Sequence, residues 1–197
     1  MKNITTQIAY FFLTLTLLLL FHSCKKEKKT ATNPFPPNTE IGSNTFIFRV
    51  NGGEIINSQV GYLSVKPRIY IFYNHNDPYF KGNHRLELSG GKLFLGVNKF
   101  INFTITNLPS KGKYQLTDVD NSAFYEDENP SELYYYTDAS HIGELDITKL
   151  DTTSHIISGT FLFKAKRWCL SGSCNEVITV DGQFDVQYNP NNSLNYY

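Results

Sequence analysis

The sequence predicts an all-β fold over residues 44–190, either a single antiparallel β-sandwich or, as the alternative, a partly open β-barrel. Short runs rich in Ile, Val, Phe, Tyr and Thr recur from Thr45 to Tyr188. Gly, Asn, Asp, Pro and Ser separate these runs at close spacing. No stretch keeps apolar residues at the i, i+3, i+4, i+7 spacing long enough to predict a helix. Together these features are typical of a sandwich or a barrel.

The expected strands are taken in chain order, and the acidic stretch 118–132 is interpreted as a loop. They are residues 45–50, 60–65, 68–73, 84–89, 92–97, 100–106, 113–118, 132–137, 143–150, 156–168 and 176–188.

The last run, 176–188, has apolar residues at one parity and polar residues at the other, except that Gly182 stands at an apolar position. A two-residue Asp-Gly hairpin would mix apolar and polar side chains on each face, which one-sided burial forbids. We therefore expect one long strand with a bulge or kink at Gly182. A hairpin with the three-residue loop Asp-Gly-Gln is the alternative.

The N-terminus has the pattern of a secretory signal peptide, residues 1–23. Lys2 is followed by an apolar run, residues 9–21, which as a helix would be about 20 Å long. Because a bilayer core is about 30 Å thick, this run is too short to be a good transmembrane helix. Residues 24–43 contain Lys, Asn, Thr and Pro but few large apolar residues, so we expect a flexible tether there.

The junction Ser23–Cys24 resembles the lipobox of bacterial lipoproteins, although Phe21 and His22 depart from the usual pattern. The resemblance implies a lipid on Cys24, hence a membrane-anchored protein on the periplasmic side of the outer membrane or on the cell surface. The alternative is an ordinary signal peptide with a chance cysteine. Without residues 1–23 the chain keeps 17 basic and 18 acidic residues, because only Lys2 is lost. This balance predicts no nucleic-acid partner.

The C-terminal third contains "SGTF" and "DGQFDV", at residues 158–161 and 181–186. With the opening "FIFRVNGGEI", these segments are similar to a set of small Bacteroidota lipoproteins grouped as a domain of unknown function. The resemblance implies an antiparallel β domain on a lipid anchor. It implies no activity, cofactor or catalytic residue.

Cys169 and Cys174 flank the sequence "LSGS" between the last two predicted strands. Outside the cytoplasm, two cysteines beside a tight turn predict a disulfide. Two free thiols or half of a metal site are the alternatives, although no CxxC or HxxxH motif supplies the other zinc ligands.

Aromatic residues gather beside the acidic stretch. Rings next to carboxylates suit stacking on a sugar or contact with a protein partner, and ordinary core packing is the alternative. The candidate binding residues are Phe124, Tyr134, Tyr136 and Trp168. The acidic residues do not have the spacing of an EF-hand, so no metal site is expected.

The sequence contains no recognisable catalytic motif. No nucleophile elbow, metalloprotease motif or phosphate-binding loop is present, and no His has a carboxylate partner at a recognisable spacing. A catalytic site assembled from residues that are distant in the sequence is the alternative.

The triplet Asp151–Thr153 resembles the O-glycosylation motif of Bacteroidota extracytoplasmic proteins, which makes Thr152 a candidate acceptor.

We expect a lipid-anchored, non-enzymatic module that binds a glycan, a peptide or an envelope partner. A hydrolase and a purely structural component are the alternatives.

Overall fold

The computed structural model describes residues 34–58, 69–74, 84–94, 97–118, 120–128, 132–170, 174–189 and 195–196. The predicted signal peptide, the first half of the predicted tether, including Cys24, and the predicted strand at 60–65 lie outside these residues. The chain divides into two compact units, Met1–Pro34 and Phe35–Tyr197. All of the strands belong to the second unit.

The second unit is built from antiparallel strands, and none of the residues in the described ranges is helical. The strands are β1 (Thr45–Val50), β2 (Ile56–Asn57), β3 (Ile69–Asn74), β4 (Arg85–Phe94), β5 (Val97–Ile105), β6 (Gly112–Leu116), β7 (Asn121–Asp127), β8 (Leu133–Tyr136), β9 (Gly143–Asp151), β10 (Ile156–Arg167), β11 (Val177–Gln187) and β12 (Asn195–Tyr196).

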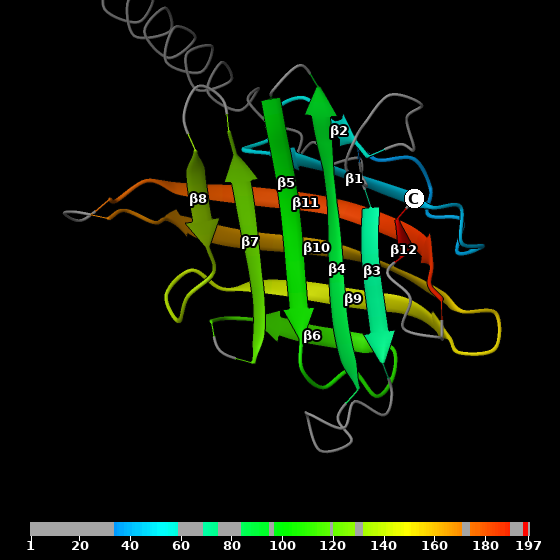
Figure 1. Ribbon diagram of the computed structural model, residues 1–197. Helices are drawn as coiled ribbons and strands as arrows, with labels where there is room; N and C mark the ends of the chain where they lie inside the picture. Colours follow the sequence, from blue (N-terminus) through cyan, green and yellow to red (C-terminus); the bar gives the residue numbers. More distant parts are fainter. Residues whose placement is uncertain are drawn as a thin grey trace, which may run out of the picture. The chain divides into compact units, whose positions relative to one another are not determined.

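These strands form one strongly curled antiparallel sheet, a half-barrel, in the order β12-β3-β4-β5-β7-β8-β10-β11-β1-β2, with β9 and then β6 added beside β10. Figure 1 shows that β3, β4, β5, β7 and β8 cross in front of β6, β9, β10, β11 and β1. The two layers are halves of one sheet, joined where Tyr135 and Tyr136 of β8 pair with Arg167 and Lys166 of β10. The all-β prediction is confirmed, and the sheet curls over its own core.

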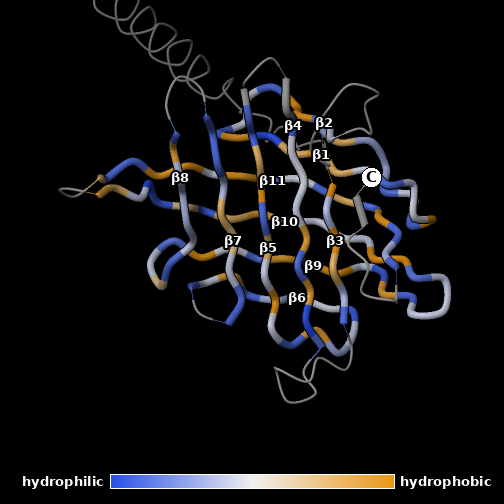
Figure 2. Tube along the Cα trace, viewed as in Figure 1, coloured by the Kyte–Doolittle hydropathy of each residue, from blue (hydrophilic) through white to orange (hydrophobic). Residues whose placement is uncertain are grey.

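The core lies between the two layers and is rich in phenylalanine. Phe103 of β5 meets Phe161 of β10 with ring centroids 4.8 Å apart, and Phe46 of β1 lies 5.5 Å from Phe161. All three rings are buried among the other apolar side chains that point inward from the strands. Figure 2 shows the alternation of hydrophobic and hydrophilic residues along the strands. Burial of these side chains is the main source of stability for the fold.

β11 is a single continuous strand, as the alternation of residues 176–188 predicted. The three-residue hairpin is excluded, because Gly182 pairs in regular register with both Phe48 and Phe161. No bulge occurs at Gly182; a Cβ there would lie 2.4 Å from the Phe161 ring, so the position leaves space for that ring. The register shift occurs instead between Ser158 and Gly159, where β10 pairs with β9.

Two expectations about the front layer are corrected. The predicted break at Gly90–Gly91 is absent, and β4 continues to Phe94. The ring of Phe46 packs directly against Gly90, where a Cβ would lie 2.3 Å from the ring. The acidic stretch 118–132 contains β7, a central strand that pairs with both β5 and β8. β7 forms because Ala123 and Tyr125 face the core while its polar residues face outward.

Residues 35–43, which we call the N-terminal strap, lie against the outer face of β11. The carboxylate of Asp185 accepts hydrogen bonds from the Thr39 hydroxyl at 2.6 Å, the Ser43 hydroxyl at 2.8 Å and the Gly42 backbone N–H at 2.9 Å. Gln183 also donates to the Pro36 carbonyl at 2.6 Å. The compact unit that contains the strands begins at Phe35, and these hydrogen bonds join residues 35–43 to β11.

Candidate functional site

The four candidate binding residues come together on the outer face of the sheet where β7, β8 and the end of β10 adjoin. Phe124 of β7 pairs with Tyr136 of β8, and their ring centroids are 5.7 Å apart. Tyr134 lies two residues from Tyr136 on the same face, while Tyr135 between them is buried. The Trp168 backbone N–H donates to the Tyr134 carbonyl at 2.7 Å, so Trp168 continues beside β8 after β10 ends.

The four candidate binding residues are more exposed to solvent than the core residues. Tyr136 is 43% exposed and Trp168 is 53% exposed. Phe124 and Tyr134 are half-buried. The group lies on the outer face of the half-barrel rather than in a concave face. Exposed aromatic side chains that adjoin one another are uncommon on a surface that has no partner.

The cross-strand register adds a fifth ring and several polar groups. Phe100 of β5 pairs with Glu126 of β7, which in turn pairs with Tyr134. In the neighbouring row, Asn102 pairs with Phe124. Phe100, Phe124, Tyr134, Tyr136 and Trp168 are called the aromatic face below. Phe100 was missed at the sequence level because its place beside β7 depends on a strand that was not predicted.

Charge surrounds the aromatic face on two sides. The pKa of Tyr134 is raised above its ordinary value by partial desolvation and by the nearby carboxylates of Glu126, Glu132 and Glu128. On the opposite side, Lys166 of β10 pairs with Tyr136. The aromatic face therefore has carboxylate hydrogen-bond acceptors on one side and an ammonium hydrogen-bond donor on the other.

The predicted disulfide is confirmed, between Cys169 and Cys174 with their Cα atoms 6.1 Å apart. It follows Trp168 directly and closes the connection between β10 and β11. Arg167 of β10 also pairs with Glu176, at 3.2 Å. These links hold the chain just beyond Trp168.

A groove of about 570 Å³ lies on the outer face of the rear layer, over β6, β9, β10 and β11. Its lining includes the apolar side chains of Ile142 and Leu162 and the polar side chains of Lys113, Glu144 and Lys164. Lys113 and Glu144 form an exposed ion pair at 2.7 Å, which raises the pKa of the lysine. The volume is within the range of small-molecule sites.

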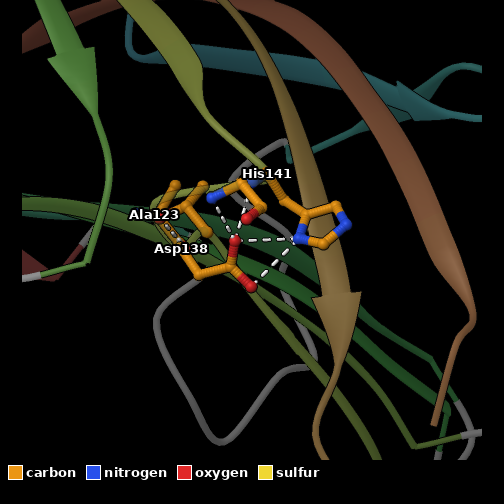
Figure 3. A network of polar contacts seen from close by, with 5 residues as sticks. Ala123, Asp138 and His141 are labelled. Atoms are coloured by element: carbon orange, nitrogen blue, oxygen red, sulfur yellow. Dashed lines mark hydrogen bonds and ion pairs between the residues drawn. The ribbon is translucent and has the colours of Figure 1, made fainter.

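At the edge of this groove, Asp138 and His141 form a pair that sequence reasoning missed. His141 Nδ1 lies 2.8 Å from Asp138 Oδ1, which also accepts the backbone N–H groups of Ser140 and His141, each at 2.7 Å. Burial opposes the charge on Asp138, but these hydrogen bonds outweigh it and lower the pKa of the carboxyl group. Figure 3 shows the other ring nitrogen pointing away from Asp138. The signal for this pair is the Asp-x-x-His spacing of "DASH".

The Asp138–His141 pair has the geometry that orients an imidazole as a general base. Ser140 and Ile142 line the groove on either side of His141 in the sequence. Within the described residues, the His141 ring has no hydrogen bond with a hydroxyl or thiol group. The pair therefore resembles the carboxylate and imidazole of a catalytic triad, and no nucleophile within the described residues contacts it.

The remaining predicted positions are distributed as follows. Thr152 is exposed in the turn between β9 and β10, where Asp151 accepts the backbone N–H groups of Thr153 and Ser154. Its glycosylation stays a prediction.

In the part of the chain that the structure describes, no group of three or more His, Cys, Asp and Glu side chains is placed to hold a metal ion. Those same residues include no helix long and apolar enough to span a bilayer. Cys24 lies outside them.

The family described as Domain of unknown function (DUF6252) matches residues 78–195, more than half of the chain. The chain belongs to this family. No curated protein and no solved structure matches it significantly. The matched region runs from before β4 to β12 and includes both the aromatic face and the groove. Membership of DUF6252 assigns no activity, so the function has to be argued from the surface itself.

Proposed function

We propose that this protein is a binding module of the bacterial cell envelope, lipid-anchored through Cys24, whose aromatic face binds a glycan. The single observation that carries the proposal is that Phe124, Tyr134, Tyr136 and Trp168 adjoin one another on one outer face. Tyr and Trp rings offer an apolar surface with a polar tip, which suits the alternating C–H and O–H groups of a sugar ring. Neighbouring Asn102, Glu126 and Lys166 add hydrogen-bonding groups.

A flat sheet face favours a glycan chain over a small buried ligand. The rings occupy neighbouring strands, β5, β7, β8 and the end of β10, in two adjacent cross-strand rows. Strands lie about 4.8 Å apart, so rings on neighbouring strands can contact consecutive sugar units. A peptide or protein ligand is the other class of partner that such rings would suit.

Binding is tested with the purified full chain on an array of bacterial surface glycans, followed by calorimetric titration of any hit. Tyr136→Ala and Trp168→Ala should each weaken binding about tenfold or more, because exposed rings at an interface centre dominate its energy. Leu162→Ala is the matched control, since it removes an exposed apolar side chain at a distant position of β10. Unchanged affinity in both aromatic variants would refute the assignment of the site. Recovery of a peptide ligand alone would refute the glycan.

The anchor is tested separately. In cells fed with an alkyne-labelled palmitate, the wild-type chain should take up the label and partition into detergent, whereas Cys24→Ala should do neither. Ser23→Ala preserves a small residue before the cysteine and should behave as the wild type. Unaltered labelling of Cys24→Ala would exclude lipidation at this position. Protease accessibility on intact cells then distinguishes the cell surface from the periplasmic side.

The Asp138–His141 pair beside the groove favours a hydrolase as the second candidate function. Ser140 and Ile142 line the groove, whereas Asp138 and His141 do not. An imidazole held by a carboxylate can remove a proton from a hydroxyl or a water bound next to it. His141→Ala should then abolish hydrolysis of ester or glycoside substrates, with Lys111→Ala, at an exposed turn, as the control. No turnover by the wild type across a broad substrate panel would leave the pair a turn-stabilising contact.

A further inference from the structure

We propose that the open end of the half-barrel, between the β4–β5 end and the β1–β2 turn, is a second binding site that takes an amphipathic anion. The ligand class is a short apolar chain with one carboxylate or phosphate head group. A cavity of about 370 Å³ lies there. Mouths of β-barrels are frequent positions for such ligands. This site is distinct from the aromatic face and does not depend on the glycan proposal.

The floor of the cavity is apolar. Val50 of β1 and Ile56 of β2 line it and pack against the hydrophobic core, and Ile55 adds an exposed apolar wall. Figure 1 shows β2 near the end of β4 that approaches β5. An apolar chain placed here would extend the core surface outward and would be removed from water.

Two lysines at the rim of this cavity have the parity of core residues, although Lys92 is exposed and the Lys99 side chain is 38% exposed. Lys92 has the parity of the core residues Leu86 and Leu88 on β4, and Lys99 has the parity of Ile101 and Phe103 on β5. Both lysines line the cavity. Inward charges can protect a sheet edge from aggregation, but β4 and β5 lie in the interior of the sheet. Edge protection therefore does not account for these lysines.

The two lysines also face each other directly across the β4–β5 pair. Like charges at directly opposed positions destabilise a sheet. Asp127 lies 3.5 Å from Lys99, and its carboxylate also accepts the Tyr125 hydroxyl at 3.0 Å. Lys92 has no ion pair within the described residues. An anionic head group between the two ammonium groups would relieve their repulsion.

The charge balance of the lining favours an anion over a cation. Lys92 and Lys99 contribute two positive charges, and Glu54 contributes the one carboxylate among the lining residues. Carboxylate and phosphate oxygens both accept hydrogen bonds from ammonium groups. The geometry therefore specifies the charge of the head group and the apolar character of the chain.

The test is a calorimetric titration of the purified full chain with octanoate, octyl phosphate, octanol and octylammonium, each below its micelle concentration. One of the two anions should bind with a stoichiometry near one, and its affinity should fall as salt is raised. Octanol and octylammonium should bind about tenfold more weakly or not at all, because they lack the charge-assisted hydrogen bonds. The octanoate and octyl phosphate arms identify which acidic head the site prefers.

Lys92→Gln and Lys99→Gln should each weaken anion binding about tenfold, whereas Glu54→Gln should strengthen it. Lys111→Gln makes the same charge change at an exposed turn and is the matched control. Lys92→Glu places opposite charges across the β4–β5 pair, so it should raise the melting temperature while removing anion binding. Equal affinity for octanol and octanoate, no binding of either anion, or unchanged affinity in Lys92→Gln would overturn the proposal.

Discussion

Asp185 shows how one residue can organise a distant segment. Its side chain is 1% exposed, and its two oxygens accept hydrogen bonds from Thr39, Gly42, Ser43 and Ser158. Backbone φ is positive at Glu40, Gly42 and Asn44, and this alternation turns successive N–H groups toward the carboxylate. Such concave arrangements of N–H groups bind anions. Here the anion is a side chain of the same molecule.

Asp185→Asn should lower the free energy of unfolding by about 3 kcal/mol, because it removes a buried charge whose hydrogen-bond donors stay behind. Asp181→Asn is the matched control, four residues earlier on the same face of β11, where the partly exposed carboxylate pairs with Arg49 at 2.9 Å. Its loss should be much smaller, since solvent screens that pair. Urea unfolding at pH 7 measures both, and equal losses would contradict the role of Asp185.

The pH dependence has a definite sign. Burial opposes ionisation of Asp185, but the donors outweigh it and hold its pKa well below the ordinary value. A carboxylate with a lowered folded-state pKa stabilises the protein above the unfolded pKa, about 3.9, and loses this contribution as the pH falls further. The stability difference between wild type and Asp185→Asn should therefore be constant from pH 5 to 7 and shrink below pH 4. A difference that grows in acid would refute this.

At the residue scale the sequence could predict chemistry along a strand but not contacts between distant segments. Parity alone placed Tyr134 and Tyr136 on one face, and the register then added Phe124 and Trp168. Asp185 looked like an ordinary solvated residue because its partners at 39–43 are more than 140 positions away. His141 was missed because its pairing with Asp138 is a local turn rather than a known motif.

At the scale of elements, long alternating strands were predictable and short or glycine-containing ones were not. Beyond its first residue, the sequence of β11 alternates between apolar and polar residues except at Gly182, so its continuity followed from the sequence. β7 was not predicted, because its polar and acidic residues outnumber its two buried residues, Ala123 and Tyr125, and the segment therefore has the composition of a loop. The break expected at Gly90 failed because glycine there serves close packing against Phe46 rather than a turn.

Gly182→Ala should lower the free energy of unfolding by about 1–3 kcal/mol, because the new methyl group would overlap the Phe161 ring and the Ile47 carbonyl. Adding Phe161→Leu should recover part of this loss, since the smaller side chain leaves space for the methyl group. The double variant should then be more stable than the sum of the single changes predicts. Additive losses in chemical unfolding would show that the two positions do not compete for space.

At the scale of the whole molecule, the all-β class was predictable but the path of the sheet was not. Alternation shows that each strand has a buried face, and it does not show whether two layers are separate or continuous. The continuity here depends on two residue pairs between β8 and β10 and on the length of β10. The N-terminal strap then covers part of the outer face, so the folded unit exceeds the run of predicted strands.

Deleting residues 35–43 from the full chain should destabilise the domain at least as much as Asp185→Asn, because it strips the buried Asp185 carboxylate of the Thr39, Gly42 and Ser43 donors. Asp185→Asn breaks the same hydrogen bonds from the other side, by removing the carboxylate that accepts them. Deleting residues 25–33 removes an equal length of chain and should leave the melting temperature unchanged. Adding Asp185→Asn to the strap deletion should cost little more, because coupled sites are not additive. Full additivity, measured by thermal unfolding, would contradict the proposed coupling.

The strap also determines how the fold would respond to mechanical force. It lies immediately before β1, which pairs with both β11 and β2. Tension applied at the N-terminus would therefore load the bonds between the strap and Asp185 before it reached the strand pairs of β1. Those bonds would break first and release a slack length of chain. The strap would thus yield before the sheet when the chain is pulled from its N-terminal side.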